Sequence, residues 1–131
     1  MTLRVINVTR GTVLARKAKP ARSFWQRFKG LMGKKELLPD EGLVIQPCAS
    51  VHTFFMSFPI DLVFYDRSNR VVAVYEKLAP FRITPFYKTA SGVVELPAGT
   101  ASESGTCIGD LLQFEDGLLC ENNQAINGRA N

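Results

Sequence analysis

The sequence contains one histidine, three cysteines and no long apolar run. The longest unbroken apolar stretches, such as Val71–Tyr75, are far shorter than the roughly 20 residues that a membrane-spanning helix needs. The first residues also lack the apolar segment and the small-residue cleavage site of a signal peptide. We therefore expect no membrane span and a cytoplasmic location.

The scarcity of cysteine and histidine limits the chemistry that the chain can perform. Cys48, Cys107 and Cys120 form an odd set without a C-x-x-C pair, which argues against a disulfide framework. The sequence also lacks a phosphate-binding glycine loop, a serine nucleophile elbow, a zinc-protease histidine pair and an RNA-binding aromatic signature. We expect free thiols, no bound metal and no cofactor, and an enzyme is not the leading hypothesis.

Acidic residues are absent from the first quarter of the chain. Residues 1–35 contain ten Lys or Arg and no Asp or Glu, whereas the remainder contains six Lys or Arg and twelve Asp or Glu. The net charge of +4 is therefore the sum of +10 and −6. A basic segment of this kind can bind nucleic acid or an anionic surface. Because these charges are interspersed with apolar residues, we favour pairing within one domain and expect nucleic-acid binding to be weak.

The chain does contain enough apolar side chains for one core. Of its 131 residues, 46% are hydrophobic and 21% are charged, a composition typical of a globular domain of this length. From about residue 117 the composition turns to Asn, Gly and Gln. We predict one compact β-rich domain over residues 1–116 and a mobile C-terminal tail over residues 117–131.

Alternating hydrophobicity and frequent Gly or Pro turns indicate many short strands. Between two of them, Asp66–Arg70 is typical of a hairpin loop, with Asn69 in the left-handed conformation. A helix is predicted after Ser23, and Thr100 is expected to cap one further helical turn. The predicted strands are Leu3–Val8, Thr12–Ala15, Gly42–Ile45, 51–56, 60–65, Val71–Glu76, Gly92–Pro97 and Leu111–Glu115. The pattern predicts an α+β fold, either a small, mainly antiparallel and partly closed β-barrel or a two-layer β-sandwich, with one or two short helices.

The most apolar stretch of the chain is Cys48–Asp66, and it also holds the single histidine. Both of its alternating faces are apolar, as in a strand that is buried on two sides. We therefore expect this stretch to form the centre of the core. The residues predicted to be mostly buried are Phe54, Phe55, Ile60, Leu62 and Phe64.

Four blocks in a fixed order resemble one protein family. The blocks are Arg27–Lys34, His52–Met56 with Pro59–Asp66, Val93–Ala101, and Gly105 with Gly109-Asp110. They are similar to the bacterial and archaeal family known as domain of unknown function 192, over about residues 20–115. The resemblance implies a small, compact β-rich fold and no established reaction. Lys34 and Ser57 depart from the family pattern, which commonly has Arg at the first position and a basic residue at the second.

Five polar side chains in apolar surroundings are candidates for binding a ligand. They are Arg27, His52, Asp61, Arg82 and Glu95. A carboxylate in an apolar segment costs several kcal/mol unless it is paired or hydrogen-bonded. Asp61 is therefore expected to accept backbone N–H bonds, to pair with Arg27 or Arg82, or to anchor a ligand beside His52. Glu95 also lies among apolar residues, so a structural role and a ligand-binding role are both open for it.

Cys48 and His52 are four residues apart and could serve as nucleophile and base, or as two zinc ligands. In an extended strand their side chains would lie about 13 Å apart, so only a bend near Ser50 would bring them together. The leading hypothesis is a non-catalytic module that binds a small molecule or peptide in a cleft beside the central strands. One alternative is an enzyme of unknown reaction that uses the Cys48, His52 and Asp61 neighbourhood. The other is a nucleic-acid or anionic-surface binder that uses the basic N-terminal third.

Overall fold

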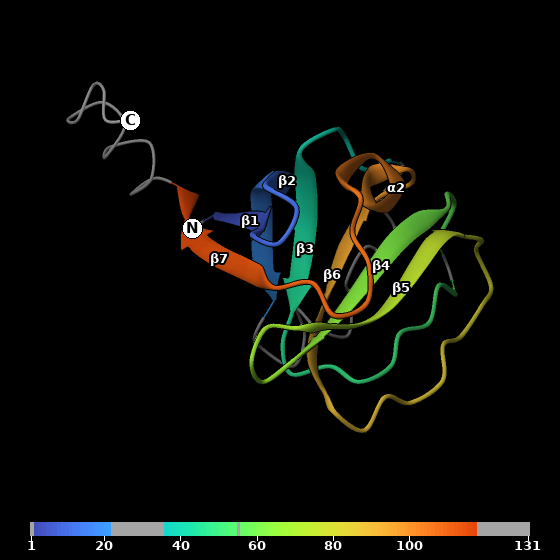
Figure 1. Ribbon diagram of the computed structural model, residues 1–131. Helices are drawn as coiled ribbons and strands as arrows, with labels where there is room; N and C mark the ends of the chain where they lie inside the picture. The colour runs from blue at the N-terminus through green and yellow to red at the C-terminus, as the bar shows by residue number, and fades with distance from the viewer. Residues whose placement is uncertain (1, 22–35, 55, 118–131) are drawn as a thin grey trace, which may run out of the picture.

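The computed structural model describes residues 2–21, 36–54 and 56–117. Within these ranges one seven-stranded sheet curls into a half-barrel with the strand order β5-β4-β6-β3-β2-β1-β7 (Figure 1). Neighbouring strands are antiparallel except β2 and β3, which run parallel. The elements are β1 (Leu3–Asn7), β2 (Thr12–Ala21), β3 (Glu41–Ile45), β4 (Ile60–Asp66), β5 (Val71–Leu78), β6 (Ala90–Pro97), α2 (Thr100–Ser104) and β7 (Leu112–Asp116). The predicted α+β class and mainly antiparallel, partly closed barrel are confirmed.

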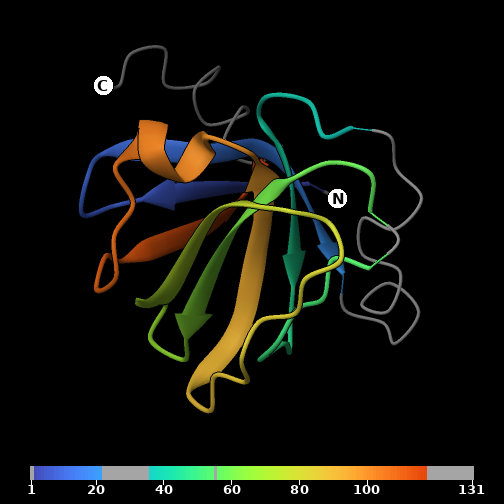
Figure 2. The same ribbon diagram turned by 90° about the vertical axis from the view of Figure 1, so that its right-hand side faces the viewer.

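The two edge strands of the half-barrel, β5 and β7, meet at one end. The amide of Val71 donates to the carbonyl of Asp110 at 2.9 Å, and the amide of Leu112 donates to the carbonyl of Asn69 at 2.8 Å. Asn69 has a φ of 64°, which is the left-handed conformation predicted for this hairpin. The short helix α2 lies across one end of the half-barrel, in contact with β2, β4, β5 and β6 (Figure 2).

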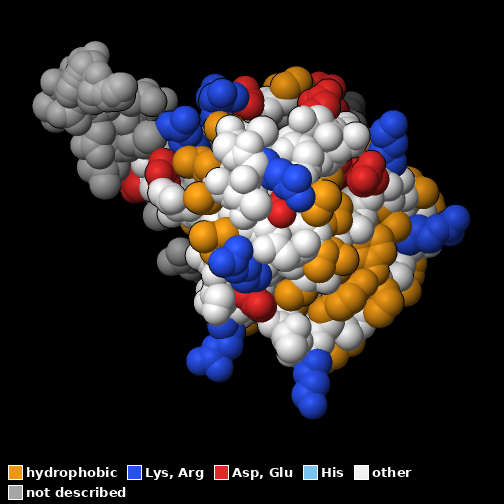
Figure 3. Space-filling view, viewed as in Figure 1, with side chains coloured by type: hydrophobic (Ala, Val, Ile, Leu, Met, Phe, Trp, Pro, Cys, Tyr) orange, Lys and Arg blue, Asp and Glu red, His pale blue; other side chains and the backbone are white. Residues whose placement is uncertain are grey.

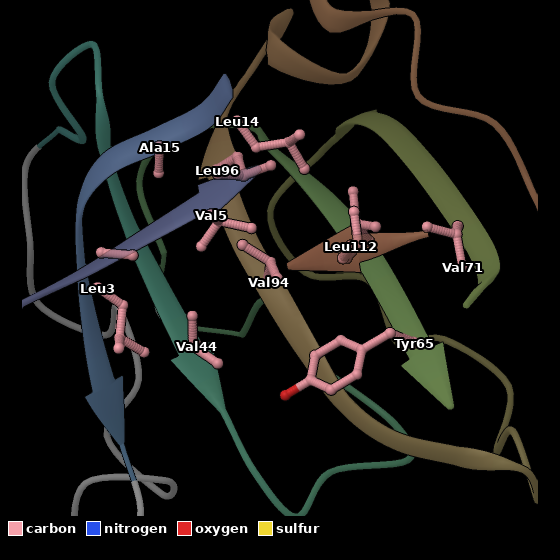
Figure 4. Close-up of a cluster of buried hydrophobic side chains, with 12 residues drawn as sticks. Leu3, Val5, Leu14, Ala15, Val44, Tyr65, Val71, Val94, Leu96 and Leu112 are labelled. Atoms are coloured by element: carbon pink, nitrogen blue, oxygen red, sulfur yellow. The ribbon is translucent and has the colours of Figure 1, made fainter. Parts of the chain in front are cut away.

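The inner face of the half-barrel holds a continuous apolar cluster (Figure 4). Its largest member is Tyr65, whose ring packs against Phe114 with centroids 4.9 Å apart. The Tyr65 hydroxyl donates to Oε1 of Gln46 at 2.9 Å. A side chain at Gly92, which is opposite Tyr65 in β6, would overlap the Tyr65 ring, so the glycine makes room for it. The other buried members are Leu3, Val5, Leu14, Ala15, Ala18, Val44, Val63, Val71, Val94, Leu96 and Leu112.

A second apolar cluster covers the outer face of the sheet. Its buried members are Ala21, Ile45, Val51, Met56, Ile60, Leu62, Phe64, Ala73 and Val93. Because successive side chains of a strand point to opposite faces, β4 contributes to both clusters and is buried on its two sides. The predicted burial of Ile60, Leu62 and Phe64 is confirmed, since each is fully buried.

The segment before β4 does not form the strand predicted over residues 51–56. His52 makes an isolated bridge with Ile83, and the segment runs as a connection over the outer cluster. Phe54 is 39% exposed, so its predicted burial is wrong. An apolar run predicts proximity to a core, but it does not distinguish a strand from a connection that covers one.

Two further differences from the sequence prediction concern the end of β2 and the start of α2. The strand β2 continues to Ala21 instead of ending at Ala15, because it pairs in parallel with β3 along this length. The helix α2 is preceded by Gly99 at its N-cap position, with a φ of 101° and no side-chain cap, so Thr100 is not the cap. Local sequence rules missed both features because each depends on a distant partner.

Some predictions fall outside the residues that the structure describes. They concern the burial of Phe55, the helix after Ser23, and the tail from residue 118 onward. Among the residues that are described, no helix is long and apolar enough to cross a bilayer.

Candidate ligand site

Glu95 is the most unusual polar residue of the sheet. It lies in β6 opposite Leu43 of β3 and Leu62 of β4, and only 3% of its surface is exposed. Its Oε2 atom is buried without a hydrogen-bond partner among the described residues. Burial raises the pKa of Glu95 to about 8, because an apolar environment disfavours the charged form. At pH 7 the protonated form of Glu95 is therefore favoured over the carboxylate.

The row of residues that crosses the outer face at Glu95 contains two more polar side chains. Lys19 is opposite Leu43 on one side, and Tyr75 is opposite Leu62 on the other. The hydroxyl of Tyr75 is hydrogen-bonded to the hydroxyl of Tyr87. Burial, together with this bond, raises the pKa of Tyr75 to about 12. The row therefore offers a carboxylic acid with two leucine neighbours and polar groups beyond them.

Asp61, by contrast, has all the partners that it needs. Its Oδ1 accepts the amide of Lys77 at 2.8 Å, and its Oδ2 accepts the amides of Gly99 at 3.1 Å and Ala101 at 2.7 Å. The residue is fully buried, and the described residues include no cation paired with it. This geometry matches the first of the three roles expected for Asp61, which is to accept backbone N–H bonds.

The structure brings His52 and Arg82 onto two connections that pair with each other. The amide of Thr53 donates to the carbonyl of Arg82 at 2.8 Å, and the amide of Arg82 donates to Oγ1 of Thr53 at 2.9 Å. Both His52 and Arg82 are exposed. The His52 ring stacks on Phe54 with centroids 5.2 Å apart. Sequence reasoning gave no sign of this pairing, because it depends on the path of both connections over the sheet.

The predicted candidates do not form one cluster in the part of the chain that is described. There, no hydrogen bond or ion pair joins His52 to Asp61 or to Glu95. The Cys48 thiol donates to the carbonyl of Ser50 at 3.1 Å. Groups of three or more potential metal ligands are also absent within the described ranges. Arg27 lies outside the described residues, so its predicted role stays a prediction.

A second polar network lies where β1 meets the turn before β7. Oδ2 of Asp110 accepts the amide of Cys107 at 2.9 Å, Nδ2 of Asn7 at 2.9 Å and Nε of Arg10 at 3.0 Å. Burial alone would raise the pKa of Asp110, but these bonds and the Arg10 charge lower it to about 2. The bonds from Asn7 and Arg10 have no signal in the local sequence, because both residues lie about 100 positions away from Asp110 in the chain.

The half-barrel and its polar positions define a small β-rich domain of the α+β class. The family model DUF192, described as an uncharacterized ACR, matches residues 5–114. The chain belongs to this family.

Two relatives are UPF0127 proteins. A UPF0127 protein of Thermococcus sibiricus is 34% identical over 121 residues, which cover 85% of this chain and 74% of the relative. A UPF0127 protein of Pyrococcus furiosus is 33% identical over 116 residues, which cover 84% of this chain and 97% of the relative.

Solved structures show the same fold. A crystal structure of a protein of unknown function from Novosphingobium aromaticivorans has a TM-score of 0.74 and 24% identity, and the match covers 86% of this chain and 84% of that chain. A candidate transcription regulator from Sinorhizobium meliloti has a TM-score of 0.73 and 24% identity, with 86% and 91% covered. At this identity the likeness concerns the fold alone.

Proposed function

We propose that this domain is a non-catalytic binding module that holds a small molecule or peptide against the outer face of its sheet. Glu95 is the recognition group in this proposal. The observation that carries it is the buried Oε2 atom of Glu95, which has no partner among the described residues. Leu43 beside it is half-buried and would provide an apolar contact, the usual makeup of a ligand pocket.

Burial of the Glu95 carboxyl group without a hydrogen bond has a free-energy cost for the domain. A buried polar group without a hydrogen bond costs about 1–3 kcal/mol, and a leucine at the same position would avoid that cost. Proteins retain such groups mainly where function requires them. A ligand that supplies the missing hydrogen bond would recover the cost on binding.

The protonation state of Glu95 indicates the ligand chemistry. A neutral carboxylic acid has one O–H donor and a carbonyl acceptor, which complement the acceptor and donor of an amide. A peptide bond or a carboxamide therefore fits Glu95 better than an anion does. The ligand would reach it through the outer face, where connecting segments rather than strands lie over the sheet.

His52 and Arg82 remain part of the proposal as exposed polar groups on the paired connections. Asp61 is assigned to the fold, because both of its oxygens are occupied by backbone amides. The enzyme alternative is not developed further, because Cys48, His52 and Asp61 each use their polar atoms elsewhere or point to solvent.

The test compares Glu95→Leu with Glu103→Leu, a control at an exposed position of α2. We expect Glu95→Leu to raise the melting temperature, because a residue kept for binding is costly to the free domain. NMR chemical-shift screening with N-acetylated dipeptide amides should then shift the amides of Leu43 and Leu62 in the wild type and not in Glu95→Leu. A lower melting temperature for Glu95→Leu, or no shifts at these amides, would contradict the proposal.

A further inference from the structure

Four large apolar side chains stand in solvent on the paired connections. Phe54 is 39% exposed, Phe81 and Ile83 are each 67% exposed, and Phe86 is 73% exposed. We call these four residues the aromatic patch. Single exposed apolar residues are ordinary, but a group of them on adjoining segments marks an interaction surface.

Hydrogen bonds between the two connections fix the backbone that carries the aromatic patch. The amide of Thr84 donates to the carbonyl of Val51 at 2.9 Å, and the amide of Tyr87 donates to the carbonyl of Ala49 at 2.8 Å. The amide of Val51 donates in turn to Oγ1 of Thr84 at 3.0 Å. Because Val51 and Thr84 are themselves buried, the connections are anchored to the outer cluster while the patch points away from it.

The two connections that carry the aromatic patch contain only positive charges. Residues 46–59 and 79–89 contain Arg82 and Lys88 and no Asp or Glu, and both cations are exposed. In Figure 3, hydrophobic side chains gather over β5 and the connections beside it, and Lys or Arg as well as Asp or Glu side chains stand around the edge of this area. The surface therefore combines apolar side chains with the two cations Arg82 and Lys88 of the same connections.

A hollow of about 520 Å³ adjoins this surface and includes Lys88, two residues after Phe86. The lining includes one carboxylate, that of Asp66. Its Oδ1 atom accepts hydrogen bonds from the amides of Ser68 at 2.8 Å and Arg70 at 3.0 Å. The hollow also offers two cations and three hydroxyl groups, which suit a phosphate group, beside a larger apolar area. The lining residues are Asp66, Arg67, Ser68, Lys88, Thr89, Ala90 and Ser91.

We propose that the aromatic patch docks the domain onto the surface of an anionic lipid bilayer. Phe81, Ile83 and Phe86 enter the headgroup region, and Arg82 and Lys88 contact lipid phosphates. Charge complementarity favours this occupant, because apolar contact and attraction of cations to anionic lipid together give interfacial binding. This inference goes beyond the proposed ligand site at Glu95 and does not depend on it.

The test is flotation of the full chain with vesicles of phosphatidylcholine alone and with vesicles that also contain phosphatidylserine. The wild type should float with the anionic vesicles. The double variant Ile83→Ser/Phe86→Ser should partition at least about tenfold less, because two apolar side chains no longer leave water. The matched control is Ile108→Ser, since Ile108 is 69% exposed on the turn before β7, and it should float like the wild type.

A second pair of variants tests the charges. Arg82→Gln/Lys88→Gln should reduce the preference for anionic vesicles, whereas Lys17→Gln/Lys19→Gln, at exposed positions of β2, should not. Glu95→Leu should float normally, so failure of the Glu95 site and failure of this inference are distinguishable.

Three results would overturn the inference. One is no flotation with anionic vesicles, and another is flotation that survives Ile83→Ser/Phe86→Ser. The third is a dimer in light scattering that the same double variant dissociates, which would assign the aromatic patch to contact between two copies of the chain. Equal flotation with both vesicle types would also contradict the inference, because it would show that binding does not require an anionic lipid.

Discussion

Oδ2 of Asp61 accepts a 2.7 Å hydrogen bond from the amide of Ala101, 40 residues further along the chain. The same oxygen accepts the amide of Gly99, which holds the N-cap position of α2 without a side-chain cap. A carboxylate from β4 therefore satisfies the amide of Ala101 in the first turn, which a local Ser, Thr or Asp satisfies at many helix N-termini. This relationship ties α2 to β4.

The first prediction concerns this tie. Asp61→Asn should lower the free energy of unfolding by about 2–4 kcal/mol. The Asn side chain has one acceptor oxygen and one NH₂ donor group, so it cannot replace both carboxylate oxygens as acceptors of backbone N–H bonds. Urea denaturation would measure the change. Asp40→Asn is the control, because Asp40 makes an exposed ion pair with Arg16 at 2.9 Å and should cost about 1 kcal/mol or less. Similar losses in the two variants would contradict the role given to Asp61.

The second prediction separates two phenylalanines of one stretch. Phe64 is fully buried and Phe54 is 39% exposed. Phe64→Ala should therefore lower the free energy of unfolding by about 3–5 kcal/mol, and Phe54→Ala by about 1 kcal/mol or less. Thermal and urea unfolding of both variants would check the difference. A larger loss for Phe54→Ala would place the core elsewhere.

The third prediction is a loss of stability with rising pH because of Glu95. Its pKa rises from an ordinary 4.5 to about 8 on folding, so between these values the folded chain holds a proton that the unfolded chain has released. The free energy of unfolding therefore falls as pH rises through this window, by roughly 3 kcal/mol at pH 7. Glu95→Gln should remove this dependence. Urea unfolding between pH 4.5 and 8 would test it, and an unchanged slope in Glu95→Gln would contradict it.

The fourth prediction has the opposite sign and concerns Asp110. Its pKa falls from an ordinary 3.8 to about 2 on folding, so its contribution to stability is present above the upper value and lost as pH falls toward the lower one. Asp110→Asn should flatten the acid limb of the stability profile and leave the alkaline limb unchanged. Circular dichroism during acid titration would show this. An acid transition of the same steepness in the variant would argue against it.

The fifth prediction concerns nucleic acid. Two cations of the basic N-terminal third pair with acids from later in the chain, as Arg10–Asp110 at 3.0 Å and Arg16–Asp40 at 2.9 Å. Duplex DNA should therefore bind with a Kd of about micromolar or weaker at physiological salt, where screening acts over about 8 Å. Fluorescence anisotropy across a salt series would measure it. Submicromolar binding that Lys17→Ala/Lys19→Ala abolishes would make this segment a nucleic-acid site.

The sequence alone was sufficient for much of the sheet. The apolar side chains of Ile60–Asp66 and of the strands around Val71 and Val93 must leave water, and the local sequence records this requirement as short apolar runs between turn residues. Asn69 likewise marks its hairpin because few other residues tolerate a positive φ. The class of fold and the doubly buried strand follow from such local rules.

Only the tertiary structure decided the roles of the polar residues. Asp61 and Glu95 look alike in the sequence, as single carboxylates in apolar strands, yet Asp61 meets three backbone amides and Oε2 of Glu95 meets no partner among the described residues. The exposure of Phe54 was also decided by the fold. A hydrogen bond or a buried face needs a partner in space, and that partner comes from segments whose approach no local pattern records.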